Sequence, residues 1–257
     1  MKASILIANY NNQIYIDECI NSLLNQTYKN IEIIFFDDLS TDNSINEVKK
    51  FSKVKLILNK ENKKKYGCYN QINSYKEALK KSTGEIIFFL DSDDFFKENK
   101  VEEIINVFKK KSELKIVFDL PTYKFKNNLK VKKRGHSPFK TYWDFMPPQS
   151  CICVKRKLID NLFDLIDVEE FPQIWMDFRV GIASKYILKN FEILDKSLTY
   201  YRQSDKNISS NYKFLSANWW RRRNEAHNYI KFFLEKNNIK FRKNFDYYST
   251  KFINIVL

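Results

Sequence analysis

Short apolar runs alternate with segments of helical spacing through the first 110 residues of the chain. Continuous apolar runs, which are typical of buried strands, cover residues 4–8, 31–36, 54–58 and 86–90. Between and after them, apolar residues recur every three or four positions, which predicts helices over residues 14–24, 42–51, 69–81 and 99–110. Strands and helices that alternate with short connections predict an α/β fold, with a mostly parallel sheet and helices on both faces.

The remainder of the chain has a less regular pattern. It predicts strands at 150–154 and 198–202, a basic hairpin or loop at 124–134, and helices at 176–187 and 213–237. The apolar run at 252–257 has no cap or stop signal, which is compatible either with a helix docked on the body of the protein or with a chain that is cut short. We therefore expect one main domain over residues 1–210 and a helical C-terminal extension over residues 211–257.

Polar side chains gather where the predicted strands end. Asn9 to Asn12 follow the first strand, Asp37 and Asp38 end the second, and a stretch from Asp91 to Asp94 ends the fourth. The carboxyl ends of parallel strands meet at one edge of the sheet, and ligands of such folds bind there. Three polar clusters at that edge predict a single site.

The stretch Asp91-Ser92-Asp93-Asp94 places three carboxylates directly after the most apolar strand. Carboxylates two residues apart can share a hard divalent cation such as Mg²⁺ or Mn²⁺, which can in turn hold a diphosphate. Without a cation, the mutual repulsion of three close carboxylates would be costly. The alternative is a helix cap or a solvated turn, which Asp and Ser also favour.

The sequences SILIANYNN, IIFFDDLSTDNS and GEIIFFLDSDD, in this order and spacing, resemble the family 2 glycosyltransferases, which have the GT-A fold. The resemblance spans residues 3–100 and implies a Rossmann-like sheet and inverting transfer of a sugar from a nucleotide-sugar donor. UDP is the nucleotide expected first, with Mn²⁺ or Mg²⁺ bound at the D-x-D sequence. Residues 1–100 would form the nucleotide-binding half of the catalytic domain, and residues 101–210 the acceptor half.

Carried over by position, the resemblance implies roles for individual residues. Asp91 and Asp93 would hold the metal ion, and Asp37 or Asp38 would accept a hydrogen bond from the base. The residues that would bind the nucleotide-sugar are Ala8, Asn9, Tyr10, Asn12, Asp37, Asp38, Asp91 and Ser92.

Asp177, in the sequence IWMDFRV, lies where the family has its catalytic base, which would take a proton from the acceptor hydroxyl. Met176 stands where an acidic residue usually precedes that base, and Ser204 replaces the histidine of the family's Tyr-Arg-x-His stretch. The usual Ala-Ala-Arg-Asn before the third helix is also missing, although Lys63 to Lys65 could supply charge for phosphates. For Asp177 the alternative is a carboxylate that stabilises a helix start.

The net charge of +14 favours anionic partners: nucleic acid, phosphate-bearing substrates or an anionic membrane. A nucleic-acid-binding protein would leave the polar clusters unexplained, and no RNP, zinc or helix-turn-helix signature is present. A nucleotidyltransferase usually has a Gly-rich basic loop after its first strand, where this chain has ANYNN. A catalytically weakened, transferase-like binder stays open because of Met176 and Ser204.

The segment Trp219-Trp220-Arg221-Arg222-Arg223 joins aromatic rings to guanidinium groups. It suits a membrane interface, and the alternative is that its tryptophans pack on the catalytic domain. We expect a glycan or lipid-linked saccharide as acceptor, no nucleic-acid partner, and a cytoplasmic protein in peripheral contact with the inner face of the membrane. No apolar run approaches the roughly 20 residues that span a bilayer. The four cysteines and the histidines, His136 and His227, lack ligand spacing and are interpreted as structural.

Overall fold

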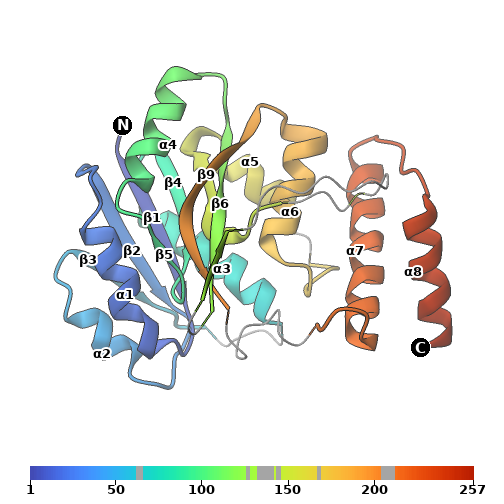
Figure 1. The fold of residues 1–257 in the computed structure, drawn as a ribbon, viewed down its shortest axis with the longest axis horizontal. Helices are drawn as coiled ribbons and strands as arrows, with labels where there is room; N and C mark the ends of the chain where they lie inside the picture. Colours follow the sequence, from blue (N-terminus) through green and yellow to red (C-terminus); the bar gives the residue numbers. More distant parts are fainter. Residues whose placement is uncertain (62–65, 126–127, 132–141, 143–145, 167–168, 204–211) are drawn as a thin grey trace.

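The computed structural model describes residues 1–61, 66–125, 128–131, 142, 146–166, 169–203 and 212–257. A mixed β-sheet forms the centre of the molecule (Figure 1). Its strands are β1 (Ala3–Asn9), β2 (Ile31–Asp37), β3 (Val54–Leu58), β4 (Ile86–Asp91), β5 (Phe95–Phe96), β6 (Ile116–Lys124), β7 (Leu129–Val131), β8 (Ile152–Lys155) and β9 (Phe191–Arg202). They are ordered β3-β2-β1-β4-β8-β6-β9-β5, and β7 pairs with the end of β6.

The strands of the first half are parallel, as predicted. β1 lies between β2 and β4, and β3 continues the sheet beyond β2. Along β1, Leu6 points to one face of the sheet while Ile5 and Ile7 point to the other, so that each face has its own apolar cluster. In the second half, β8 runs antiparallel to β4 and β6, whereas β6 and β9 are parallel.

Helices cover both faces of the sheet. On one face, α1 (Gln13–Leu24), α2 (Ser44–Lys49) and α4 (Lys100–Lys110) pack on the cluster that contains Ile5 and Ile7. On the other, α3 (Gly67–Lys80), α5 (Arg156–Ile166) and α6 (Met176–Ala183) pack on the cluster that contains Leu6. Burial of these two apolar clusters supplies the main driving force for the three-layer arrangement, at about 25 cal/mol for each Å² of apolar surface.

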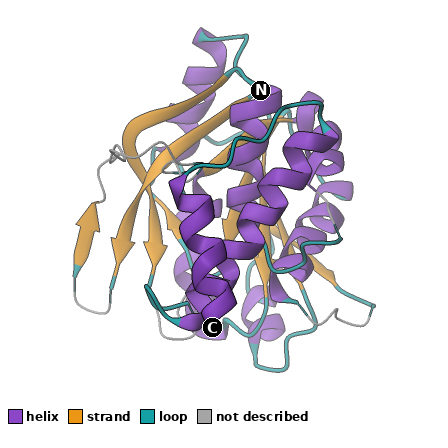
Figure 2. Ribbon diagram, turned by 90° about the vertical axis from the view of Figure 1, so that its right-hand side faces the viewer, coloured by secondary structure: helices purple, strands orange, loops and turns teal. Residues whose placement is uncertain are grey.

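Two antiparallel helices, α7 (Ala217–Lys236) and α8 (Phe245–Val256), follow at one side of this sandwich (Figures 1 and 2). The buried face of α7 belongs to the same apolar cluster as α3, α5 and α6. α8 lies along α7 and is held by Asp246, which pairs with Arg223 and lies 3.3 Å from Nε2 of buried His227. Within the described residues, no helix has both the length and the apolar character needed to cross a membrane.

The predicted strands and helices of the first half are confirmed to within two residues at each end. The pattern of the second half predicts β9 and α8 too short and does not predict β6 or α5. In β6, Asp119 and Thr122 interrupt the apolar run although both are buried. Asp119 can lie inside because Lys100 pairs with it across the fold.

The contacts of the segment from Trp219 to Arg223 lie mainly within the C-terminal helices, and the packing of its tryptophans on the catalytic domain stays a prediction. The rings of Trp219 and Trp220 are half-buried and lie 4.7 Å apart in an edge-to-face contact. Arg223 pairs with Asp246 and lies 5.0 Å from the ring of Trp219. The segment lies within α7 and contacts α8 through Arg223. Arg221 is the exposed residue among its three arginines.

Candidate active site

The three polar clusters lie together at the carboxyl edge of the sheet, as predicted. The parallel register places Asn9 of β1 opposite Asp37 of β2, and half-buried Ala8 opposite Asp91 of β4. Ala8 and Asp91, which are 83 positions apart in the sequence, therefore become neighbours through strand pairing alone.

The loop after β1 is fastened to the loop after β2. The amide of Asn9 donates to Asp37 Oδ2 at 2.8 Å and to Ser40 Oγ at 3.1 Å. Asn11, in the left-handed region with φ 52°, accepts from the backbone N–H of Thr41 at 2.7 Å. Asn9 is 2% exposed and connects the two loops through these hydrogen bonds. The next residue, Tyr10, is 50% exposed.

Asp37 and Asp38 have different surroundings. Both oxygens of buried Asp37 accept hydrogen bonds, Oδ2 from Asn9 and Oδ1 from the backbone N–H of Ser40 at 2.9 Å. Asp38 accepts from the amide of Asn59 at 2.7 Å through Oδ1. Asp37 is therefore tied into the two loops through both of its oxygens, and Asp38 is tied to the segment that follows β3.

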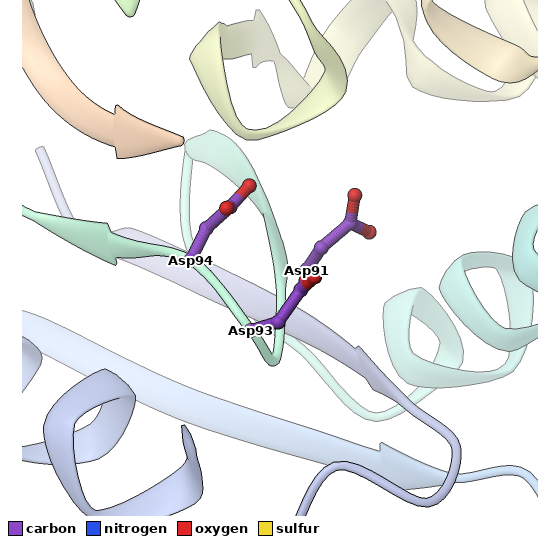
Figure 3. Close-up of side chains that lie close together, drawn as sticks. All are labelled: Asp91, Asp93 and Asp94. Atoms are coloured by element: carbon purple, nitrogen blue, oxygen red, sulfur yellow. The ribbon is translucent and has the colours of Figure 1, made fainter. Parts of the chain in front are cut away.

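Asp91, Asp93 and Asp94 lie close together at the turn that follows β4 and form the acidic cluster (Figure 3). One oxygen of each carboxylate lies within 4.8 Å of the others. The turn is closed by a hydrogen bond from Asp94 N–H to the Asp91 carbonyl at 3.0 Å. Ser92 is buried inside it, where its hydroxyl accepts from the amide of Asn12 at 3.0 Å. Asn12 and Ser92 therefore shape the turn.

Side chains from distant elements hold these carboxylates in place. Gln71 and Tyr75, one turn apart on α3, both donate to Asp91 Oδ1, at 2.7 and 2.8 Å. At the end of β9, Arg202 donates its backbone N–H to Asp94 Oδ1 at 2.7 Å and its Nε to the Asp93 carbonyl at 2.8 Å. The position of the acidic cluster thus depends on α3 and β9 as well as on β4.

A buried ion pair lies next to the acidic cluster. Ser150 donates its hydroxyl to Asp94 Oδ2 at 2.5 Å and accepts from the backbone N–H of Asp91 at 3.1 Å. Lys100 donates to the Ser150 carbonyl at 2.7 Å, and its Nζ lies 2.8 Å from Asp119 Oδ1. Both charged side chains are fully buried, where each needs the other to offset its desolvation. The pair therefore connects α4 and β6 to the segment that supports the acidic cluster.

The surroundings of the carboxylates raise their pKa values. Burial, with repulsion from Asp93, raises the pKa of Asp91 to about 7, and burial raises that of Asp93 to about 6. The pKa of Asp94 is also raised well above its ordinary value, again mainly by burial. Close carboxylate oxygens with little solvation are a donor set suited to a hard divalent cation, whose charge favours the ionised forms. The residues therefore fit Mg²⁺ or Mn²⁺.

Asp177 lies in the first turn of α6, close enough to the acidic cluster for its charge to raise the pKa of Asp91. Its Oδ1 accepts from the backbone N–H of Phe178 at 2.8 Å. Burial raises the pKa of Asp177 to about 7, and the nearby positive charge of Arg222 opposes that shift. A half-buried carboxylate with this pKa is suited to accept a proton from a hydroxyl group.

Met176, which precedes Asp177, is fully buried and connects α6 to the acidic cluster. The amide of Gln149 donates to its sulfur at 3.3 Å, and Gln149 also hydrogen-bonds to Tyr75. Tyr75 in turn donates to Asp91. The apolar residue at position 176 thus packs in the core, and Asp177 is the carboxylate that the first turn of α6 provides.

The supporting residues Gln71, Tyr75, Ser150 and Arg202 are missing from the sequence-based prediction of the site. Gln71 and Tyr75 could have been found from their spacing of four on one helix face. Nothing in the local sequence of Ser150 indicates its contact with Asp94. The predictions that concern Lys63 to Lys65, His136 and Ser204 lie outside the described residues.

The sequence matches the profile of glycosyl transferase family 2 over residues 4–163, which is more than half of the chain. The protein belongs to this family. Two Escherichia coli relatives, WfaP and WfgD, each bear the name UDP-Glc:alpha-D-GlcNAc-diphosphoundecaprenol beta-1,3-glucosyltransferase, and each is 31% identical to this glycosyltransferase. The alignments cover 81% and 84% of this chain and 80% and 83% of the relatives. The chain is also 28% identical to an uncharacterized glycosyltransferase of Nostoc sp. over 219 residues, and it spans 65% of that relative's length.

Solved structures of other glycosyltransferases share the fold. TarS of S. aureus, in complex with UDP, superposes with a TM-score of 0.64 at 18% identity over 99% of this chain and 70% of that chain. The mannosyltransferase PcManGT of Pyrobaculum calidifontis, in complex with GDP-Man and Mn²⁺, gives 0.59 at 13% identity over 97% and 68%. At these identities the likeness is one of fold, and it confirms the expected GT-A architecture.

The raised pKa of Asp177 predicts a pH-dependent stability difference between the wild type and Asp177→Asn. The folded state keeps the Asp177 proton up to about pH 7, whereas the unfolded chain releases it near the ordinary value of 3.8. The wild type therefore loses stability between these values as the pH rises, and asparagine has no proton to lose. In thermal unfolding with EDTA present, the melting temperature of Asp177→Asn should rise relative to that of the wild type from pH 4 to 7. Above pH 7 the difference should stay constant.

The matched control is Asp160→Asn on the exposed surface of α5. Its difference from the wild type should stay constant over the same pH range. A constant difference for Asp177→Asn as well would show that the folded protein does not perturb this carboxylate.

Proposed function

We propose that this family 2 glycosyltransferase is an inverting enzyme that transfers a hexose from a UDP-sugar to a sugar carried on a lipid diphosphate. One observation carries the proposal: Asp177 follows Met176 in the first turn of α6, and Gln149 and Tyr75 link Met176 to Asp91 of the acidic cluster. The pKa of Asp177 is also raised to about 7. This arrangement offers a base for the acceptor next to a metal-binding donor set for the nucleotide.

On the donor side, Ala8, Tyr10 and Asp38 would border the nucleoside. Asn9, Asn12, Asp37 and Ser92 would keep the surrounding loops in shape, as their internal hydrogen bonds suggest. UDP is the preferred nucleotide because TarS is seen with UDP and because the names of WfaP and WfgD specify UDP-Glc. The same two names specify a sugar on diphosphoundecaprenol as acceptor, which supports a lipid diphosphate here.

Asp91 and Asp93 would hold Mn²⁺ or Mg²⁺, and the manganese complex of PcManGT supports this assignment. When bound, the ion would supply positive charge to the diphosphate leaving group. Gln71, Tyr75 and Arg202 keep the two aspartates in position through the hydrogen bonds described above.

Asp177 would act as the general base on the acceptor side. It takes the proton from an acceptor hydroxyl, whose oxygen forms a bond to C1 of the donor sugar. The bond between C1 and the diphosphate oxygen breaks at the same time, and UDP leaves with its electron pair. Attack from the side opposite to the leaving group inverts the configuration at C1.

Family membership removes two of the alternative interpretations of the sequence, a nucleic-acid-binding protein and a nucleotidyltransferase. The third, a weakened transferase-like binder, predicts UDP binding without turnover. Met176 no longer favours it, because this residue packs in the core and Asp177 remains available at the helix start.

A transfer assay tests the proposed reaction directly. UDP-glucose and N-acetylglucosamine on an alkyl diphosphate are the first pair to use, with Mn²⁺ present, and the product should carry an inverted anomeric centre. Asp177→Asn should lower turnover by about 10² to 10⁴ because asparagine cannot accept the proton. Product formation by chromatography and UDP affinity by calorimetry are the two measurements.

In this assay Asp160→Asn again serves as the control, and it should keep both turnover and UDP affinity. The variant Asp177→Asn should bind UDP with the affinity of the wild type, which would show that its nucleotide-binding site is intact. Normal turnover of Asp177→Asn would remove this residue from the mechanism. UDP binding by the wild type without transfer from any UDP-sugar to any lipid diphosphate acceptor would favour the weakened binder.

We also propose that the C-terminal helices contact an anionic membrane, where a lipid-linked acceptor would reside. Residues 211–257 contain ten Lys and Arg against three Asp and Glu. α8 presents an exposed apolar stripe at helical spacing, and two further apolar residues are exposed just before α7. These residues are Phe245, Tyr248, Phe252 and Ile255 in the stripe, and Phe214 and Leu215 before α7. Apolar side chains among basic ones are typical of helices that lie on a membrane surface.

Vesicle sedimentation tests the membrane contact. The wild type should bind anionic vesicles more strongly than neutral ones, and binding should weaken with salt because exposed charges are screened. Replacing both Phe245 and Phe252 by serine should lower binding at least about tenfold, since each large apolar side chain contributes roughly 1.5–3 kcal/mol when it leaves water.

Leu58→Ser, at an apolar residue of β3 that is 45% exposed, is the matched control and should bind vesicles like the wild type. Equal binding of all variants to both kinds of vesicle would contradict the membrane contact. Self-association that depends on Phe245 and Phe252, with no vesicle binding, would instead assign the stripe to a second copy of the chain.

A further inference from the structure

Arg222 of α7 is a half-buried cation held between two aromatic rings. Its guanidinium carbon lies 3.9 Å from the ring centroid of Trp175 and 4.0 Å from that of Tyr212. Stacking of this kind fixes the plane of the guanidinium group and leaves its N–H edges for other partners. The stacking therefore orients the side chain, and among the described residues no hydrogen bond from its guanidinium group is seen.

Within the described part of the chain, no carboxylate pairs with Arg222, and its Nε is buried without a hydrogen-bond partner. Two other arginines of this region, buried Arg179 and half-buried Arg223, are satisfied by the protein. Arg179 donates to the backbone carbonyls of Ile174 and Ile166, and Arg223 pairs with Asp246. A desolvated donor without a partner is unfavourable unless a ligand supplies the acceptor. Arg222 thus has the environment of a ligand-binding residue.

The place of Arg222 relates it to the acceptor side of the site. Its stacking partner Trp175 immediately precedes α6, and Asp177 lies two residues further on. α7 packs against α6 through Tyr229, whose ring lies 6.2 Å from that of Phe178 (Figure 1). The positive charge of Arg222 lowers the pKa of Asp177, whereas the arginine whose charge acts on Asp93 is Arg202. Arg222 is therefore associated with Asp177, and Arg202 with the acidic cluster.

We propose that Arg222 binds the diphosphate of the lipid-linked acceptor. The inference rests on the proposed function, in which Asp177 deprotonates a hydroxyl of the acceptor sugar. In such an acceptor the diphosphate is attached to that same sugar, so an anion must lie one sugar ring away from the base. A guanidinium group beside Asp177 meets this need, because its planar N–H fork matches the oxygens of a phosphate. The donor diphosphate, by contrast, would be bound by the cation that the acidic cluster holds.

Kinetics with two acceptors distinguish binding of the acceptor diphosphate from a structural role and from binding of the donor nucleotide. One acceptor carries N-acetylglucosamine on an alkyl diphosphate, and the other carries the same sugar on an uncharged alkyl chain. Arg222→Gln should raise the KM for the diphosphate acceptor by about 10- to 100-fold, the range for loss of a charged hydrogen bond. The KM for UDP-sugar and the KM for the uncharged acceptor should stay unchanged. Arg222→Lys should restore part of the loss.

Arg221→Gln provides the matched control, because it removes the same charge from the exposed neighbouring position on α7. It should leave all three KM values unchanged. An equal rise in KM for both acceptors would assign Arg222 a purely structural role, and a rise in the KM or Kd for the nucleotide would assign it to the donor. Either result would overturn the proposal.

A binding measurement makes the inference independent of the sugar specificity. An alkyl diphosphate without a sugar is titrated into the full chain in EDTA, and the fluorescence of the tryptophans, which include Trp175, reports binding. The wild type and Arg221→Gln should bind it, and Arg222→Gln should bind at least about tenfold more weakly. This outcome would support the inference even if no sugar transfer were found. Absence of binding to the wild type, or equal binding to all three proteins, would overturn it.

Discussion

The burial of three carboxylates at the end of a central strand is the constraint on which the rest of the site depends. Charged groups in such a position are unfavourable unless hydrogen bonds, opposite charges or a cation offset their desolvation. Here the protein supplies donors to Asp91 from α3 and to Asp94 from β9 and Ser150. These contacts leave the pKa values of Asp91 and Asp93 raised to about 7 and about 6, so the site is incompletely neutralised by the protein alone. A divalent cation would complete it.

The same constraint explains why so much of the chain converges on one turn. Ser150 contacts Asp94 with its hydroxyl and Lys100 with its carbonyl, and Lys100 pairs with Asp119 in the interior. Elements that are remote in sequence are thus tied to the acidic cluster by polar contacts as well as by apolar packing. A loss of either buried charge would leave the other unpaired, which typically costs about 3–5 kcal/mol.

The sequence predicts the sheet edge well because the apolar pattern of each strand is local and parallel strands end at the same edge of a sheet. Apolar runs that end in Asn9, Asp37 and Asp91 needed only parallel pairing to become neighbours, and the structure confirms this pairing. The second half could be predicted less well because its signals are non-local. Asp119 interrupts the pattern of β6, and only the distant Lys100 explains how it is buried. Arg222 was assigned to a basic segment, yet its environment comes from Trp175 and Tyr212 in other parts of the chain.

The C-terminal helices extend the catalytic sandwich rather than standing apart from it. α7 contributes its buried face to the core shared with α6, and this packing brings Arg222 toward Asp177. α8, in contrast, leaves much of its apolar surface exposed, including Phe252 at 68% and Ile255 at 84%. In the proposed account, α7 contacts the charged part of the acceptor while α8 contacts the lipid surface around it.

The central claim is that the acidic cluster holds the nucleotide through a divalent cation, and calorimetry of UDP binding tests it most directly. UDP is titrated into the wild type with Mn²⁺, into the wild type with EDTA, and into Asp93→Asn with Mn²⁺. Asp195→Asn, at an exposed position of β9, is the control. EDTA and Asp93→Asn are each expected to weaken binding at least about tenfold, since changing even the residues that support metal ligands typically costs this much, while the control binds like the wild type. Equal affinity under all four conditions would contradict the claim.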